Sequence, residues 1–125
     1  MRHTLRILVT GALLACSSTA AVADDVGVVG TPVGLSVNTP VGDTFLQYHG
    51  RLFVKAVDGT VLEYRWGGSS CGSRVLTDAQ VAALQAALNN NKMRIQVLTQ
   101  DGQGLSKCVV GFTAAPKSAV KLVFP

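Results

Sequence analysis

Two β-rich runs separated by an Asp-Gly pair constrain the fold of this chain more than any other feature. Residues 51–57 (RLFVKAV) and 60–66 (TVLEYRW) flank Asp58-Gly59. An Asp-Gly pair between such runs is a strong signal for a two-residue hairpin turn. Strands joined by so short a turn pair antiparallel, so we expect a β-hairpin at the centre of the chain.

The two-residue turn predicts which side chains share a face of the hairpin. It places Arg51 opposite Trp66, Phe53 opposite Tyr64, and a lysine opposite a leucine nearer the turn. Aromatic rings beside cations suit the stacking of sugars or bases. The alternative is that the rings belong to the core, with Arg51 stacked on Trp66 at its rim. The candidate ligand-binding residues are Arg51, Tyr64 and Trp66.

One helix is predicted by its N-terminal capping residues, its stripe of apolar side chains and the residues that end it. Residues 77–80 (TDAQ) form a capping box, in which the Thr77 and Gln80 side chains each bond the other's backbone. Val81, Leu84 and Leu88 then recur at helical spacing. Three asparagines end the helix at residues 89–91. It has no acidic or basic face, so we expect it to be structural.

The remaining segments are predicted to be β-strands. They are a short strand to about residue 76 after a glycine-rich bend, an alternating strand at 93–97, a strand at 107–112 beyond a turn at 101–104, and a terminal strand at 120–124. The order of hairpin, short strand, helix and hairpin is that of a five-stranded OB-type barrel. The predicted fold is therefore mainly β with one helix (β-β-β-α-β-β), with the barrel over residues 45–125.

Residues 24–44 are predicted to be an extended arm outside this barrel. Residues 31–34 and 39–42 repeat the pattern Thr-Pro-Val-Gly. Proline removes a backbone donor and glycine loosens the chain, so a regular central strand is not expected here. The valines of the arm offer an alternative role, the addition of an edge strand to a neighbouring subunit.

Residues 1–23 have the pattern of an export signal. A basic start is followed by a short apolar stretch and by Ala21-Val22-Ala23, whose small residues suit signal peptidase. The competing interpretation is a lipoprotein, because Leu13-Leu14-Ala15-Cys16 resembles a lipobox that would lipidate Cys16. No other apolar run is long enough to span a membrane. We expect a periplasmic or secreted protein.

Cleavage changes what the composition implies. It removes Arg2 and Arg6 and no acid, so the net charge falls from +4 to +2. A charge of +2 without a run of basic residues does not favour nucleic-acid binding, which needs several clustered phosphate contacts. We therefore expect no nucleic-acid partner.

Two cysteines, Cys71 and Cys108, remain after cleavage. A redox pair would favour a close C-x-x-C motif, which is absent, and a metal site would need partners beyond the remaining histidine, His49. In an oxidising compartment the two cysteines are predicted to form a structural disulfide, worth about 4 kcal/mol for a loop of this size. No metal and no cofactor are expected.

The pattern of residues 51–112 resembles small secreted OB-fold proteins related to pentameric toxin B subunits of the pertussis and subtilase types. The shared features are export, a cysteine before one central helix, and a Val/Ile-rich hairpin carrying a second cysteine. The resemblance implies a non-enzymatic protein that binds glycans as a ring-shaped homo-oligomer. The resemblance assigns no binding residue in this chain, because no stretch matches the sugar-contacting motif of that group.

The sequence therefore predicts an exported binding module for a glycan or another envelope ligand. The alternative is a structural envelope protein that acts through protein-protein contacts. An enzyme is not expected, because turns and a helix start account for Asp58, Asp78 and Asp101, and His49 has no identified partner.

Overall fold

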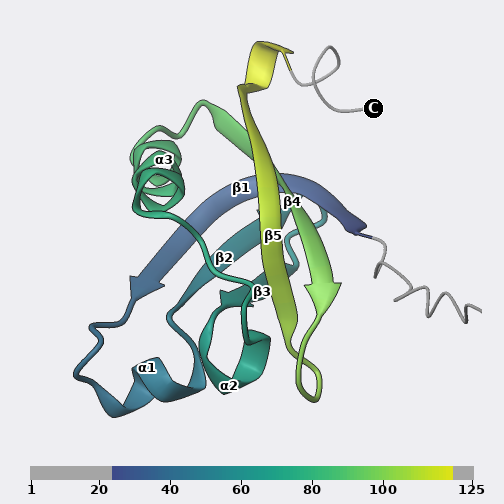
Figure 1. The fold of residues 1–125 in the computed structure, drawn as a ribbon. Helices are drawn as coiled ribbons and strands as arrows, with labels where there is room; N and C mark the ends of the chain where they lie inside the picture. Colours follow the sequence, from purple (N-terminus) through teal and green to yellow (C-terminus); the bar gives the residue numbers. More distant parts are fainter. Residues whose placement is uncertain (1–23, 120–125) are drawn as a thin grey trace, which may run out of the picture.

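The computed structural model describes residues 24–119, which form a mainly β fold with five strands (Figure 1). The strands are β1 (Asp25–Val37), β2 (Gly50–Ala56), β3 (Val61–Trp66), β4 (Met93–Asp101) and β5 (Lys107–Pro116). The helices are α1 (Asp43–Gln47), α2 (Gly68–Cys71) and α3 (Asp78–Leu88), and a 3-10 turn, η1 (Lys117–Ala119), follows β5. The predicted export signal at 1–23 and the predicted strand at 120–124 lie outside the described residues.

The strand pairings close into a ring in the order β1-β2-β3-β5-β4. β1 pairs antiparallel with both β2 and β4, and the pairs β2–β3 and β4–β5 are also antiparallel. β3 and β5 run parallel where Arg65 meets Cys108. In Figure 1, β1 curves across the back of the β4–β5 pair, α3 lies to one side, and α1 and α2 lie together at the lower end.

The segment predicted to be an arm contributes a full member of this ring. Gly30 of β1 pairs with Ala56 of β2 and with Ile95 of β4. A Cβ atom at Gly30 would lie 2.6 Å from the Lys55 carbonyl oxygen, so glycine permits the close approach. The β1–β2 register shifts between Pro32 and Gly34, the kind of irregularity that admits a proline. The prediction that no regular strand forms here is therefore wrong for residues 25–37.

The central hairpin forms, but one residue out of the predicted register. Arg51 pairs with Arg65, and Leu52 pairs with Tyr64. The loop holds three residues, because the Ala56 N–H donates to the Thr60 carbonyl oxygen at 2.8 Å. A shift of one residue exchanges the faces of one strand relative to the other, so the predicted face of rings and cations does not form.

The predicted helix is confirmed as α3. Thr77 Oγ1 accepts from the Gln80 N–H at 3.2 Å, and Gln80 Oε1 accepts from the Thr77 N–H at 2.9 Å, which completes the capping box. Leu84 is buried on its inner face. The short strand predicted before this helix is absent from the described residues 72–77, and the two short helices α1 and α2 were not predicted.

The core side chains pack inside the ring of strands, and the predicted disulfide joins α2 to β5. The core comprises Leu52, Val54, Tyr64, Trp66, Leu84, Ile95, Val97 and Val109. Cys71 at the end of α2 and Cys108 of β5 form the disulfide with their Cα atoms 5.7 Å apart. A Cβ atom at Gly102 would lie 2.5 Å from Cys108 Sγ, so the β4–β5 turn packs directly on the bridge.

Candidate functional site

The hairpin register separates the three residues predicted to bind a ligand. Trp66 is 2% exposed and Tyr64 is 5% exposed, and both belong to the core. Burial raises the pKa of the Tyr64 phenol. Arg51 lies on the opposite face of the hairpin, paired with Arg65. The prediction that Arg51, Tyr64 and Trp66 share an exposed face is therefore wrong, because the strands pair one residue away from the expected register.

The outward face of β2 and β3 instead carries a cluster of cations and rings, which we call the outer cluster. Its members are Tyr48, Arg51, Phe53, Glu63 and Arg65. The Arg65 guanidinium carbon lies 4.6 Å from the centroid of the Tyr48 ring, and that of Arg51 lies 5.6 Å from it. Arg51 also lies 5.1 Å from the centroid of the Phe53 ring. These distances are those of cation-π contacts.

One carboxylate links the two arginines. Arg65 Nε donates to Glu63 Oε1 at 2.7 Å, and Arg51 Nη1 lies 3.8 Å from the same oxygen. Like charges directly opposite on paired strands repel, and Glu63 offsets part of that repulsion. The side chains of Arg51, Glu63 and Arg65 are each about one-third exposed (36%, 34% and 31%), so a ligand can reach them. The outer cluster keeps a net charge of +1.

Arg51 has an unused donor within this cluster. Its Nε atom is buried and has no hydrogen-bond partner. A buried donor without a partner among residues 24–119 costs free energy, so a ligand reaches Arg51 through its outer Nη groups. The cation-π contacts hold the guanidinium in place without using its N–H groups.

The segment between β1 and β2 places Tyr48 beneath the arginines. The Tyr48 N–H donates to the Thr44 carbonyl oxygen at 3.0 Å, which closes α1. The Tyr48 carbonyl oxygen accepts from Asn38 Nδ2 at 2.9 Å. The His49 N–H then donates to the Trp66 carbonyl oxygen at 2.7 Å, which fixes the loop against the end of β3. Tyr48 is 8% exposed, so its ring forms the floor of the cluster.

A hollow of about 490 Å³ adjoins the outer cluster. It is lined by Glu63, Arg65, Leu105, Ser106 and Lys107, so the cluster and the β4–β5 turn share its walls. Leu105 is fully exposed at the tip of that turn. Lys107 pairs with Asp101, and the hydrogen bond to this carboxylate raises the pKa of the lysine. The hollow extends the ligand-accessible surface from the cluster to the turn.

The outer cluster groups side chains that can form ion pairs, hydrogen bonds and stacking contacts. It offers two guanidinium groups, a half-buried Phe53 ring and one carboxylate, all held by packed strands. Within residues 24–119 no group of three His, Cys, Asp or Glu side chains is placed to hold a metal ion. His49 stacks on Phe45 with the ring centroids 3.9 Å apart. The expectations of no cofactor and no enzymatic activity stay predictions.

Neither the protein-family models, nor the curated sequences, nor the solved structures give a match to the chain. Among the helices of residues 24–119, none is long and apolar enough to cross a membrane.

Proposed function

We propose that this chain is an exported, non-enzymatic binding module that recognises a glycan through the outer cluster. The observation that carries the proposal is the pair of partly exposed guanidinium groups, Arg51 and Arg65, held over aromatic rings on one face of a hairpin. A guanidinium can bond hydroxyls or a carboxylate in bidentate fashion, and the Phe53 ring offers a π-face to sugar C–H groups. The net charge of +1 favours a glycan with a carboxylate-bearing sugar.

We further propose that the ring of strands is an OB-type barrel. The order β1-β2-β3-β5-β4, the parallel contact between β3 and β5, and α3 between β3 and β4 support this assignment. OB-folds commonly bind oligosaccharides and oligonucleotides on the face of strands 2 and 3, beside the loops that join strands 1–2 and 4–5. The outer cluster and the hollow beside it occupy that position. The resemblance to toxin B subunits belongs to the same proposal.

Export is part of the proposal and has structural support in the cysteines. The Cys71–Cys108 bridge lies inside the fold, and such structural disulfides persist in oxidising compartments. The intact mass of the exported protein distinguishes cleavage after Ala23 from lipidation at Cys16. A mass that retains residues 1–23 would contradict cleavage by either route.

The test of glycan binding is a glycan array followed by titration of the strongest carboxylated glycan. Arg65→Gln removes one guanidinium, and we expect about a tenfold or greater loss of affinity, because a hydrogen bond to a charged group is lost. The matched control is Lys55→Gln, which removes one charge from an exposed side chain of β2 outside both the outer cluster and the hollow beside it. The carboxyl-reduced form of the same glycan should bind as weakly as the Arg65 variant binds the acid. Equal losses in both variants, or equal binding of the reduced glycan, would refute the site.

Self-association is the second candidate function, and exposed valines on β1 favour it. Val26, Val28, Val33 and Val37 are between 46% and 62% exposed on this strand. Exposed apolar side chains along one strand suit a protein-protein contact, and the proposed occupant is a second copy of the chain. Sedimentation of the wild type should give a mass above the monomer, and Val28→Lys should return it to the monomer. A wild-type monomer at all concentrations would refute this role.

A further inference from the structure

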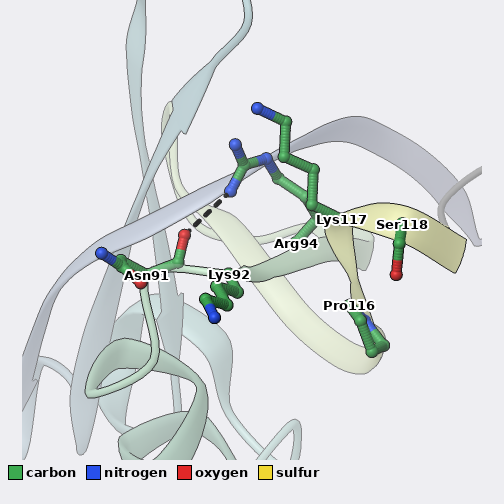
Figure 2. Close-up of a pocket in the computed structure, with 6 residues that line it drawn as sticks. All are labelled: Asn91, Lys92, Arg94, Pro116, Lys117 and Ser118. Carbon is green, nitrogen blue, oxygen red and sulfur yellow. Dashed lines mark hydrogen bonds between the residues drawn. The ribbon is translucent and has the colours of Figure 1, made fainter.

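A second charged site lies where the β4–β5 pair leaves the ring, at the start of β4 and the end of β5. The structure has a groove of about 580 Å³ there, lined by Asn91, Lys92, Arg94, Pro116, Lys117 and Ser118 (Figure 2). Three of these six residues are cations, and none of the lining residues within 24–119 is acidic. The groove shares no residue with the outer cluster or with the hollow beside it.

The strand register brings the three cations together. Met93 pairs with Pro116, and the Lys117 N–H donates to the Lys92 carbonyl oxygen at 2.7 Å. Arg94 follows two residues after Lys92 on the same segment. The positive charges are therefore concentrated by backbone pairing, which limits how far their Cα atoms can separate.

The Arg94 guanidinium is anchored on one side and open on the other. Its Nη1 atom donates to the Met93 carbonyl oxygen at 3.1 Å and to the Asn91 carbonyl oxygen at 3.4 Å, and Figure 2 shows the second of these bonds. No further bond engages Nε or Nη2 within residues 24–119. In the view of Figure 2 the side chains of Arg94 and Lys117 extend in the same direction.

Ordinary structural roles explain only part of this arrangement. Lys92 follows the C-terminus of α3, where a cation offsets the negative end of the helix dipole. That role does not require Arg94 or Lys117. The salt bridges of the described residues join Arg51, Arg65 and Lys107 to acids, and none involves Lys92, Arg94 or Lys117. The groove therefore concentrates unneutralised positive charge.

We propose that this groove binds the oxyanion of a phosphate or sulfate group. Such a group carries enough charge to offset several cations at once, and two of its oxygens match the fork of a guanidinium. Arg94 binds the oxyanion through its free N–H groups, and Lys117, which extends beside it in Figure 2, binds it as a point charge, while Lys92 adds positive charge on the rim of the groove. The Ser118 hydroxyl and the Asn91 amide supply neutral donors on the rim of the same groove. The free inorganic ion and an ester on an extracellular polysaccharide are two sources of this one chemistry.

The test is a titration of isotope-labelled protein followed by amide chemical shifts. The probes are sodium sulfate, sodium phosphate, dextran sulfate and neutral dextran, all at one ionic strength set with sodium chloride. We expect saturable shifts centred on Lys92, Arg94 and Lys117 with dextran sulfate and none with neutral dextran. Shifts at the same amides with the inorganic ions assign recognition to the oxyanion alone. Shifts with dextran sulfate only assign the group to a polysaccharide.

Charge-removing variants distinguish binding in the groove from nonspecific attraction to the overall positive charge of the protein. Lys117→Gln removes a side chain that makes no hydrogen bond with residues 24–119, and we expect it to weaken dextran sulfate binding about threefold, the scale of one exposed charge. The double variant Arg94→Gln/Lys117→Gln should bind dextran sulfate at least about tenfold more weakly by the same reasoning. The matched control is Lys55→Gln, an equal charge change on β2, which should bind as the wild type does. Equal losses in the control and the double variant, or no shifts with any probe, would overturn the proposal.

Discussion

Substitution of Gly50 by alanine tests the packing that the hairpin register produces. Gly50 pairs with Trp66 across β2 and β3. A Cβ atom at Gly50 would lie 2.2 Å from Trp66 Cζ2 and 2.7 Å from the Ser36 carbonyl oxygen of β1. One of these neighbours is backbone and the other is a ring only 2% exposed, so neither can move away freely. Overpacking of this kind costs about 1–3 kcal/mol, and we expect Gly50→Ala near the upper value.

The matched control is Gly111→Ala. Gly111 also lies in a strand, and neither glycine has a positive φ. A Cβ atom at Gly111 would meet Leu98 Cδ1 at 3.5 Å, which is ordinary contact. Since alanine also has fewer unfolded conformations than glycine, this variant should be neutral or more stable by up to about 1 kcal/mol.

The assay is equilibrium unfolding in urea, followed by the fluorescence of Trp66, the single tryptophan of the chain. The midpoint of Gly50→Ala should fall well below that of Gly111→Ala. A double-mutant cycle in a Trp66→Phe background is followed by far-ultraviolet circular dichroism, because that background lacks the fluorophore. There the cost of Gly50→Ala should shrink, because the smaller ring makes room for the added methyl group. Equal costs for the two alanine variants, or an unchanged cost in that background, would refute the reasoning.

Three further predictions concern the bridge, the buried phenol and the helix cap. Replacement of Cys71 and Cys108 by serine should lower the free energy of unfolding by about 4 kcal/mol for a loop with a sequence separation of 37. The same loss should follow from reducing the wild type, and a loss below about 1 kcal/mol in urea unfolding would contradict it. Burial raises the folded-state pKa of Tyr64 above its model-compound value of 10.0. The stability that this shift contributes is therefore complete below pH 10.0 and falls as the pH rises through the folded-state pKa, and Tyr64→Phe should flatten that fall in alkaline unfolding curves. Thr77→Ala breaks the capping box and should cost about 1 kcal/mol by urea unfolding, whereas an unchanged midpoint would show that the cap is dispensable.

Features set by local chemistry were predictable from the sequence. The Thr77–Gln80 box needs only the side chains and backbone of one turn, and it forms as expected. The alternation at residues 93–97 also produces a strand with Ile95 and Val97 buried. The cysteine pairing followed from there being two candidates in the cleaved chain, and the bridge forms between them.

The hairpin register was missed because Asp-Gly fits turns of more than one length. The three-residue loop uses Asp58 to accept from the Thr60 N–H at 2.9 Å, and a backbone hydrogen bond to this carboxylate lowers its pKa. The correct register can be recognised because it separates apolar pairs from charged pairs along the two strands. The observed pairing puts Leu52 beside Tyr64 and Arg51 beside Arg65, whereas the expected pairing mixed apolar and charged residues on one face. Comparing both registers on this criterion would have favoured the observed one.

The pairing of β1 within the ring depends on contacts with distant strands, which the local sequence does not reveal. Glycine and proline weaken a strand considered alone. In the ring, Gly30 allows β2 to approach closely, and Pro32 lies beside a register shift. The outer cluster was hidden for a related reason, because Tyr48 reaches Arg51 and Arg65 through the segment between β1 and β2, which a hydrogen bond from the His49 N–H fixes to the end of β3.

The most direct test of the proposed function is amide chemical-shift mapping with the strongest carboxylated glycan from the array. The account predicts shifts that centre on Tyr48, Arg51, Phe53 and Arg65 and spread toward Leu105, while the indole resonance of the buried Trp66 changes little. Shifts centred on the groove at Lys92, Arg94 and Lys117, with the outer cluster unaffected, would contradict it.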